Sequence, residues 1–135
     1  MQFGFRPREV LALTGLTYRQ LDYWDRVGLV KPSIARAEGK GCIRVYSFWD
    51  IVQLRVAKCL LEKGISFRVV KEVMGEVSKY SNADMVDKVV IITGDYVSVA
   101  VNKTPVDYDS DSVMYLSDIA GELQKELFGS QVSNY

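Results

Sequence analysis

Apolar residues recur at helical spacing through most of the first 80 positions. Val10 and Leu13 give a first short helix its apolar face, and Gly15 is suited to end that helix. Thr17 follows closely, and Gln20 stands three positions beyond it, which is the pattern of a capping box. We therefore predict two short helices joined by a tight, glycine-containing turn, the arrangement of a helix-turn-helix.

Residues 32–47 break this pattern. A turn signal at 38–41 precedes the sequence CIRVY, in which positions alternate. Arg44 and Tyr46 would share one face of a strand, and Ile43 and Val45 the other. We expect a β-hairpin here, and we refer to residues 31–46 as the wing.

Two more helices are predicted after the wing. Ser47, with Asp50 three positions later, caps the first, which ends at Gly64, and Ser66 opens the second. Helical signals fade at 80–84. We interpret this stretch as the boundary between a domain at 1–80 and a module at 81–135.

Strand patterns dominate the rest of the chain. Two β-rich runs flank Gly94-Asp95, a hairpin signature, and shorter extended pieces are expected around Val106 and in SVMYL. Helical spacing returns over about 118–128. The predicted fold class is α+β: an N-terminal winged helix-turn-helix of four helices plus a β-hairpin wing, then a small C-terminal β-hairpin/α module.

Charge divides the chain in the same place. The 135 residues have no net charge, yet residues 1–80 hold 14 Lys and Arg against 8 Asp and Glu, a net +6. Residues 81–135 hold 3 against 9, a net −6. This asymmetry indicates a basic module that meets a polyanion, joined to an acidic module with a different role. We expect this module, residues 81–135, to dimerise or to bind a protein partner.

The second predicted helix has two chemically different sides. At about 100° per residue, Arg19, Tyr23 and Arg26 line one edge, and Leu21 and Trp24 lie opposite. A solvated face with a stray tyrosine is the simpler interpretation. A recognition helix is favoured, because guanidinium groups suit guanine edges and phosphates, and a tyrosine hydroxyl suits a phosphate oxygen. The wing supports this interpretation with four basic residues against Glu38 alone.

These elements, in this order, resemble the DNA-binding domain of the MerR superfamily of transcriptional regulators. The helix TYRQLDYWD at 17–25, its exit GLVKP, the wing end RVYS and the junction GIS agree with the family pattern over about residues 5–78. The resemblance implies a sequence-specific regulator that binds double-stranded DNA as a homodimer, with helix 17–27 in the major groove and the wing on phosphates. The predicted DNA-binding residues are Thr17, Tyr18, Arg19, Tyr23, Arg26, Arg36, Lys40, Arg44 and Tyr46, with Thr17 and Tyr46 near the backbone.

Two features depart from the family pattern. Asp22 stands where an arginine is usual, and its charge should repel phosphate, so either the helix sits differently or Asp22 pairs with a neighbour such as Arg26. Family members usually continue into one long helix that pairs with a second subunit, whereas strands are predicted here after Asp84. The family's dimer mechanism therefore cannot simply be transferred.

No enzyme activity, metal or cofactor is predicted. Histidine is absent, and Cys42 and Cys59 are expected to be ordinary reduced thiols. Asp107, Asp109 and Asp111 open like a calcium loop, but the glycine that such a loop needs is missing, so an acidic turn is favoured. Without a secretory leader or an apolar run of membrane-spanning length, we expect a cytoplasmic, nucleoid-associated protein.

Two alternatives stay open. An architectural or excisionase-like factor would use the same winged helix without regulating a promoter. A protein-interaction adaptor would act through residues 81–135 and use the helix-turn-helix only as a fold.

Overall fold

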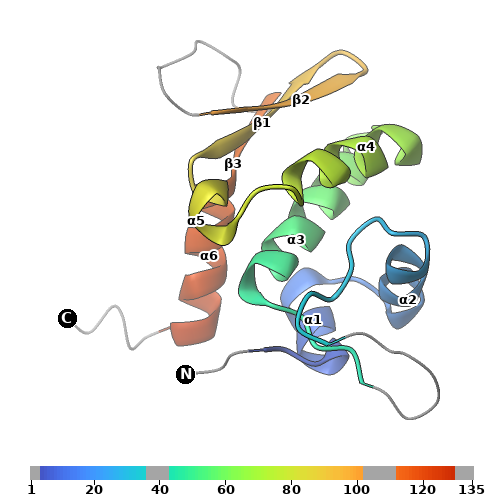
Figure 1. The fold of residues 1–135 in the computed structure, drawn as a ribbon, viewed down its shortest axis with the longest axis vertical. Coiled ribbons are helices and arrows are strands. Elements are labelled where there is room, and N and C mark those ends of the chain that lie inside the picture. Colours follow the sequence, from blue (N-terminus) through green and yellow to red (C-terminus); the bar gives the residue numbers. More distant parts are fainter. Residues whose placement is uncertain (1–3, 36–42, 102–111, 130–135) are drawn as a thin grey trace.

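The computed structural model describes residues 4–35, 43–101 and 112–129. In chain order these residues form helices α1 (Pro7–Thr14), α2 (Tyr18–Arg26), α3 (Phe48–Glu62), α4 (Phe67–Val77) and α5 (Asn82–Met85). Strands β1 (Lys88–Thr93), β2 (Tyr96–Val101) and β3 (Val113–Tyr115) follow, and helix α6 (Leu116–Phe128) comes last. The α+β fold class and the four N-terminal helices are confirmed (Figure 1).

The base of the wing pairs as an antiparallel hairpin. Ala35 and Val45 form a bridge, with Val45 N donating to Ala35 O at 2.7 Å. A second bridge joins Phe5 to Tyr46, so the chain ahead of α1 adds to the hairpin. The sequence pattern did not predict this second pairing. The hairpin tip, with Arg36 and Lys40, lies outside the described residues.

The C-terminal strands form one antiparallel sheet in the order β2-β1-β3. Val90 in the central strand lies opposite Val99 on one side and Met114 on the other. Gly94 closes the β1–β2 hairpin with φ 62°, a conformation that glycine adopts without steric cost. The extended piece predicted around Val106 lies outside the described residues, whereas the one predicted at SVMYL is β3.

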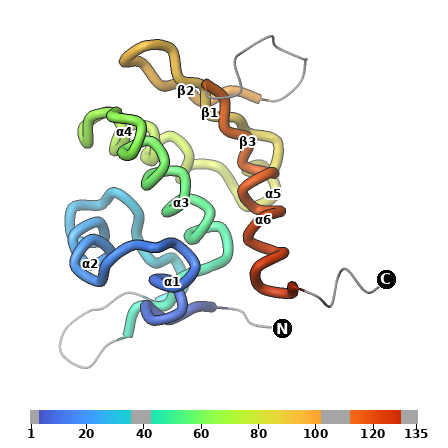
Figure 2. Tube along the Cα trace, turned by 180° about the vertical axis from the view of Figure 1, so that it is seen from behind, coloured from blue at the N-terminus to red at the C-terminus, as the bar shows by residue number. Residues whose placement is uncertain are grey.

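A single buried cluster of apolar side chains joins the two predicted units. It runs from Phe5 in the N-terminal segment through α3 to Leu123 in α6, and it includes Val90 of the sheet. Helix α3 packs against both α1 and α6, and α4 packs against β2. Figures 1 and 2 show α6 alongside α3, with the sheet at the end of the molecule far from α1 and α2. The acidic module is therefore packed onto the helices of the basic one.

The segment predicted as a domain boundary is partly helical. Ser81 caps the four-residue helix α5, whose last residue, Met85, joins the core. Among the described residues, no helix is long and apolar enough to cross a membrane.

Candidate nucleic-acid interface

Local sequence sets the turn between α1 and α2. Gly15 ends α1 with φ 73°, and its N–H donates to Leu11 O at 2.9 Å. Thr17 Oγ1 accepts from Gln20 N at 3.1 Å, and Gln20 Oε1 accepts from Thr17 N at 2.9 Å. This is the predicted capping box, and it fixes the direction in which α2 leaves the turn. The Thr17 hydroxyl thus stabilises the helix start.

Helix α2 buries one side and exposes the other, as predicted. Leu21 and Trp24 lie in the core, whereas Arg19 is exposed. Tyr18 and Tyr23 are large aromatic residues left 57% and 45% exposed. Aromatic rings with a polar tip on an open helix face are suited to contacts with another molecule. We refer to Tyr18, Arg19, Tyr23 and Arg26 as the α2 face.

Helix α4 supports the α2 face from the side. The ring of Phe67, its first residue, lies 5.9 Å from the ring of Tyr23 at a tilt of 43°. Arg26 places its guanidinium carbon 5.7 Å from the centre of the same Tyr23 ring. Stacking and cation–π attraction restrict Tyr23 and leave its ring half-exposed. Sequence reasoning did not connect Phe67 with this face.

A single arginine of the wing holds two carboxylates of α2. Arg44 Nε donates to Asp25 Oδ2 at 2.7 Å, and Arg44 Nη2 donates to Asp22 Oδ1 at 2.6 Å. The Arg44 side chain is only 11% exposed. Desolvation alone would lower the pKa of Arg44, but the hydrogen bonds from Asp25 and Asp22 outweigh it and raise that pKa. We refer to Arg44, Asp22 and Asp25 as the α2–wing clamp.

The clamp explains the unusual Asp22. Its second oxygen, Oδ2, accepts from Arg26 Nε at 3.0 Å, so the pairing expected with Arg26 is present. Arg26 and Arg44 thus neutralise the negative charge of Asp22, which therefore need not repel a DNA phosphate. Arg44 is hydrogen-bonded to both aspartates, and its predicted contact with DNA stays a prediction. Its placement fits a residue that positions α2 rather than one that reaches out to a ligand.

The structure does not place Tyr46 on the surface, where a residue near the DNA backbone would lie. Its side chain is fully buried, and its hydroxyl has no hydrogen-bond partner in the part of the chain that the structure describes. Burial, and then the negative charge of Asp25, raise the pKa of Tyr46. The alternation that placed Tyr46 beside Arg44 was correct, but this face of the strand packs inward. Phe5 of the N-terminal segment lies beside Tyr46 through their backbone bridge, and both side chains belong to the core.

Two further contacts attach the start of the wing to the helices. Lys31 Nζ donates to Asp25 O at 3.1 Å, at the end of α2. Asp50 Oδ2 accepts from Ser33 N at 2.8 Å and from Ser33 Oγ at 2.7 Å while it also caps α3. The loop between α2 and the wing is therefore held at both ends.

Arg55 is a residue that sequence reasoning missed. Its Nε and Nη2 donate to Leu13 O at 2.9 and 2.6 Å, and Nη2 also pairs with Glu126 of α6. It therefore joins the last turn of α1 to the C-terminal helix. Its position between Leu54 and Val56 on an apolar helix was a weak signal, because long side chains often reach past a core to solvent.

The clamp should make stability depend on pH. Hydrogen bonds from Arg44 and then Arg26 lower the pKa of Asp22. A lowered pKa stabilises the fold above the usual aspartate pKa of about 3.9, and this stabilisation is lost as the pH falls through the folded-state pKa. We expect the difference in free energy of unfolding between the native chain and Asp22→Asn to shrink below about pH 4. Urea unfolding across this range measures it, with Asp95→Asn at the exposed β1–β2 turn as the control. A difference that stays constant would contradict this role of Asp22.

Comparison with known proteins identifies the family. The sequence profile described as MerR HTH family regulatory protein matches residues 5–77, more than half of the chain. The chain belongs to this family. Over 68 residues it is 48% identical to an uncharacterized HTH-type transcriptional regulator of Mycobacterium bovis and to two of Mycobacterium tuberculosis strains. The match covers 50% of this chain and 30% of each relative, so this chain is matched to less than a third of each relative's length.

The described residues of this MerR-family protein contain no metal site. No group of three or more His, Cys, Asp or Glu side chains is arranged there to hold a metal ion. The acidic stretch at 107–111 and Cys42 lie outside those residues. Cys59 is a free, half-buried thiol on α3.

Proposed function

We propose that this protein is a DNA-binding transcriptional regulator whose helix α2 enters the major groove. The α2 face carries this proposal. It presents two guanidinium groups and two half-exposed tyrosines on one side of a capped helix, with Leu21 and Trp24 packed behind. Arginine forks and tyrosine hydroxyls are suited to base edges and phosphate oxygens. The names of the mycobacterial relatives and the family membership support the same function.

The clamp gives α2 a defined position relative to the wing. An orientation error in a recognition helix would misplace several contacts at once, so a fixed helix favours sequence-specific binding. Under this proposal Arg44 positions α2, while Arg36 and Lys40 remain predicted phosphate contacts. Thr17 acts through the helix start that it caps.

We further propose that the protein acts as a homodimer on a two-fold site in the cytoplasm, associated with the nucleoid. A regulator with one short recognition helix per chain gains specificity by reading two half-sites one helical turn apart. Residues 81–135 would supply the dimer contact or a partner surface. This differs from the long pairing helix of typical members, because β1 follows α5 directly.

Selection of bound sequences from a random duplex pool tests the proposal. We expect an inverted repeat, and we expect the affinity for it to fall steeply between about 50 and 200 mM salt because phosphate contacts release counterions. Fluorescence anisotropy on the selected duplex measures this dependence. If the intact chain shows no salt-sensitive binding to any duplex, the proposal is wrong and the adaptor interpretation is favoured. Enrichment at recombination sites rather than promoters in genome-wide footprinting would favour the architectural alternative.

A further inference from the structure

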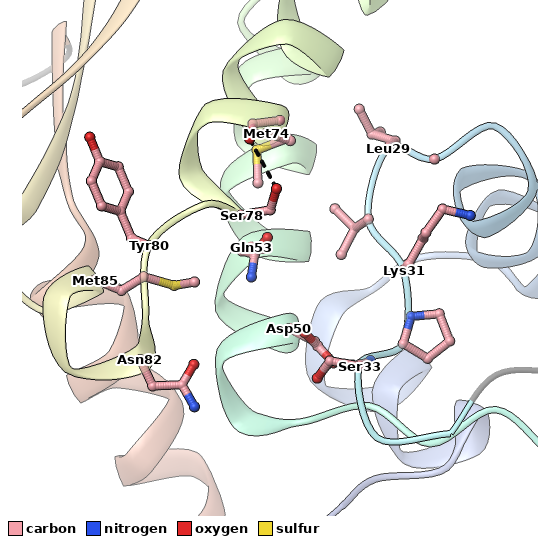
Figure 3. A pocket seen from close by; sticks show the side chains of 14 residues that line it. Leu29, Lys31, Ser33, Asp50, Gln53, Met74, Ser78, Tyr80, Asn82 and Met85 are labelled. Atoms are coloured by element: carbon pink, nitrogen blue, oxygen red, sulfur yellow. Dashed lines mark hydrogen bonds between the residues drawn. The ribbon is translucent and has the colours of Figure 1, made fainter.

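A pocket of about 280 Å³ lies between the loop that leaves α2 and the segment that leads into α5. One wall is the loop 28–33, the floor is α3, and the opposite wall is the end of α4 with Tyr80, Asn82 and Met85 (Figure 3). Its volume is just below the range for small-molecule sites, about 300–1,000 Å³. This pocket lies apart from the α2 face.

One polar side chain in this pocket is buried and unpaired. Gln53 is 7% exposed and lines the pocket, and its carboxamide makes none of the hydrogen bonds found among the described residues. Figure 3 shows that the amide of Gln53 is directed into the pocket. The amide atoms of Gln53 are not among the fully buried, unpaired polar atoms of the described residues, so they reach the space of the pocket. The side chain therefore offers one donor and one acceptor, side by side, to whatever occupies the pocket.

The charged groups around the pocket are already engaged. Asp50 Oδ2 accepts three hydrogen bonds, two from Ser33 and one from Ser47 N. Lys31 points away from the pocket towards α2, where its amine donates to Asp25 O (Figure 3). Among the described residues that line the pocket, no cation other than Lys31 could balance an anionic ligand, and the Asp50 carboxylate would repel one. The pocket is suited to a neutral molecule.

The remaining walls are apolar and adaptable. Met74 and Met85 lie on the wall made by α4 and the segment into α5, and Leu29 lies on the loop opposite (Figure 3). Methionine side chains adjust to flat or irregular ligands because they are unbranched and polarisable. A flat ring could lie between these side chains while its polar edge faces Gln53.

We propose that this pocket binds a small neutral heterocycle whose ring carries an adjacent N–H and C=O, as in a lactam or a nucleobase. Glutamine makes this kind of paired contact with the donor and acceptor edge of adenine. Such a ligand would satisfy both polar groups of Gln53 and would touch the loop before the wing and the segment before α5 at the same time. This inference does not depend on DNA binding.

The test uses 2-pyridone, the simplest stable ring with this edge, and N-methyl-2-pyridone, which has the same carbonyl but no donor. Titrations of the full chain are followed by ¹⁵N–¹H NMR, in which the side-chain amide of Gln53 gives its own pair of signals. We expect saturable shifts centred on Gln53, Met74 and Met85. Methylation of the ring nitrogen, or Gln53→Leu, should weaken binding about tenfold, because a pair of hydrogen bonds is lost. Gln124→Leu, on the exposed side of α6, is the matched control and should leave binding unchanged.

A second variant keeps the test decisive if Gln53→Leu disturbs the core. Gly75 lines the pocket, and a Cβ added there would meet no atom within 4 Å. Gly75→Leu should therefore fold and fill the pocket, and we expect it to abolish the shifts without lowering the unfolding midpoint. Absence of saturable shifts with 2-pyridone, equal affinity for the N-methyl compound, or unchanged binding by Gly75→Leu would each overturn the proposal. None of these outcomes bears on whether the protein binds DNA.

Discussion

Arg44→Ala is expected to lower the free energy of unfolding by about 3 kcal/mol, the low end for breaking a buried ion pair. The reason lies in what the substitution leaves behind. Asp25 has a side chain only 8% exposed, and it loses its hydrogen-bonded charged partner, keeping only the more distant Lys31 Nζ at 3.9 Å from Oδ1. Asp22 is more exposed and keeps Arg26, so it adds less to the loss. Urea unfolding followed by circular dichroism measures the effect.

Arg26→Ala is the matched control for this prediction. It also removes one guanidinium from Asp22, but the Arg26 side chain is 62% exposed. Exposed ion pairs contribute little, so a loss of no more than about 0.5 kcal/mol is expected. A double-mutant cycle between Arg44→Ala and Asp25→Ala isolates the coupling between the two residues. If Arg44→Ala costs no more than Arg26→Ala, the α2–wing clamp does not hold α2 in place.

Arg19→Ala is expected to weaken binding to the selected DNA site by about 1–3 kcal/mol while it leaves stability nearly unchanged. Arg19 is exposed on the α2 face, and none of the hydrogen bonds or ion pairs described above involves it. Its removal therefore costs the fold little. If its guanidinium reads a base edge, discrimination against other sequences is lost with it. Anisotropy titrations on the selected duplex and on a scrambled duplex of equal length separate the two effects.

Lys125→Ala provides the control for charge. It removes one exposed positive charge on α6, which Figure 1 shows away from α2. Its affinity for both duplexes should change little. If Arg19→Ala lowers the affinity for the selected and the scrambled duplex equally, Arg19 contacts phosphate rather than bases. That result would contradict the base-reading role of Arg19.

Comparison of Arg19 with Arg44 shows where sequence reasoning reached its limit. Both are arginines within motifs of the family, and both were predicted to contact DNA. The exposure of Arg19 follows from its position on one amphipathic helix, which a local pattern determines. The position of Arg44 depends on Asp22 and Asp25, 22 and 19 residues earlier, and no local pattern records that pairing.

The C-terminal module gives the same lesson. Both strands of the hairpin around Gly94-Asp95 and the last helix could be predicted, because alternation and helical spacing are local properties. Their packing could not. Val90 and Leu123 share one core with the N-terminal helices, and Arg55 joins α1 to α6. The change in composition at residue 80 separates a basic part of the chain from an acidic part. It does not determine whether those two parts pack together in the folded protein.

The sequence by itself therefore determined the capped helices, the amphipathic α2 with its exposed arginines and the family to which they belong. These features follow from short-range periodicity, capping hydrogen bonds and glycine conformations. Only the tertiary structure decided that Tyr46 is buried, that Arg44 holds Asp22 and Asp25, and that Gln53 faces a pocket without a partner. Each of these outcomes depends on which side chains from distant segments compete for the same space and the same hydrogen bonds, and only the folded chain brings those segments together.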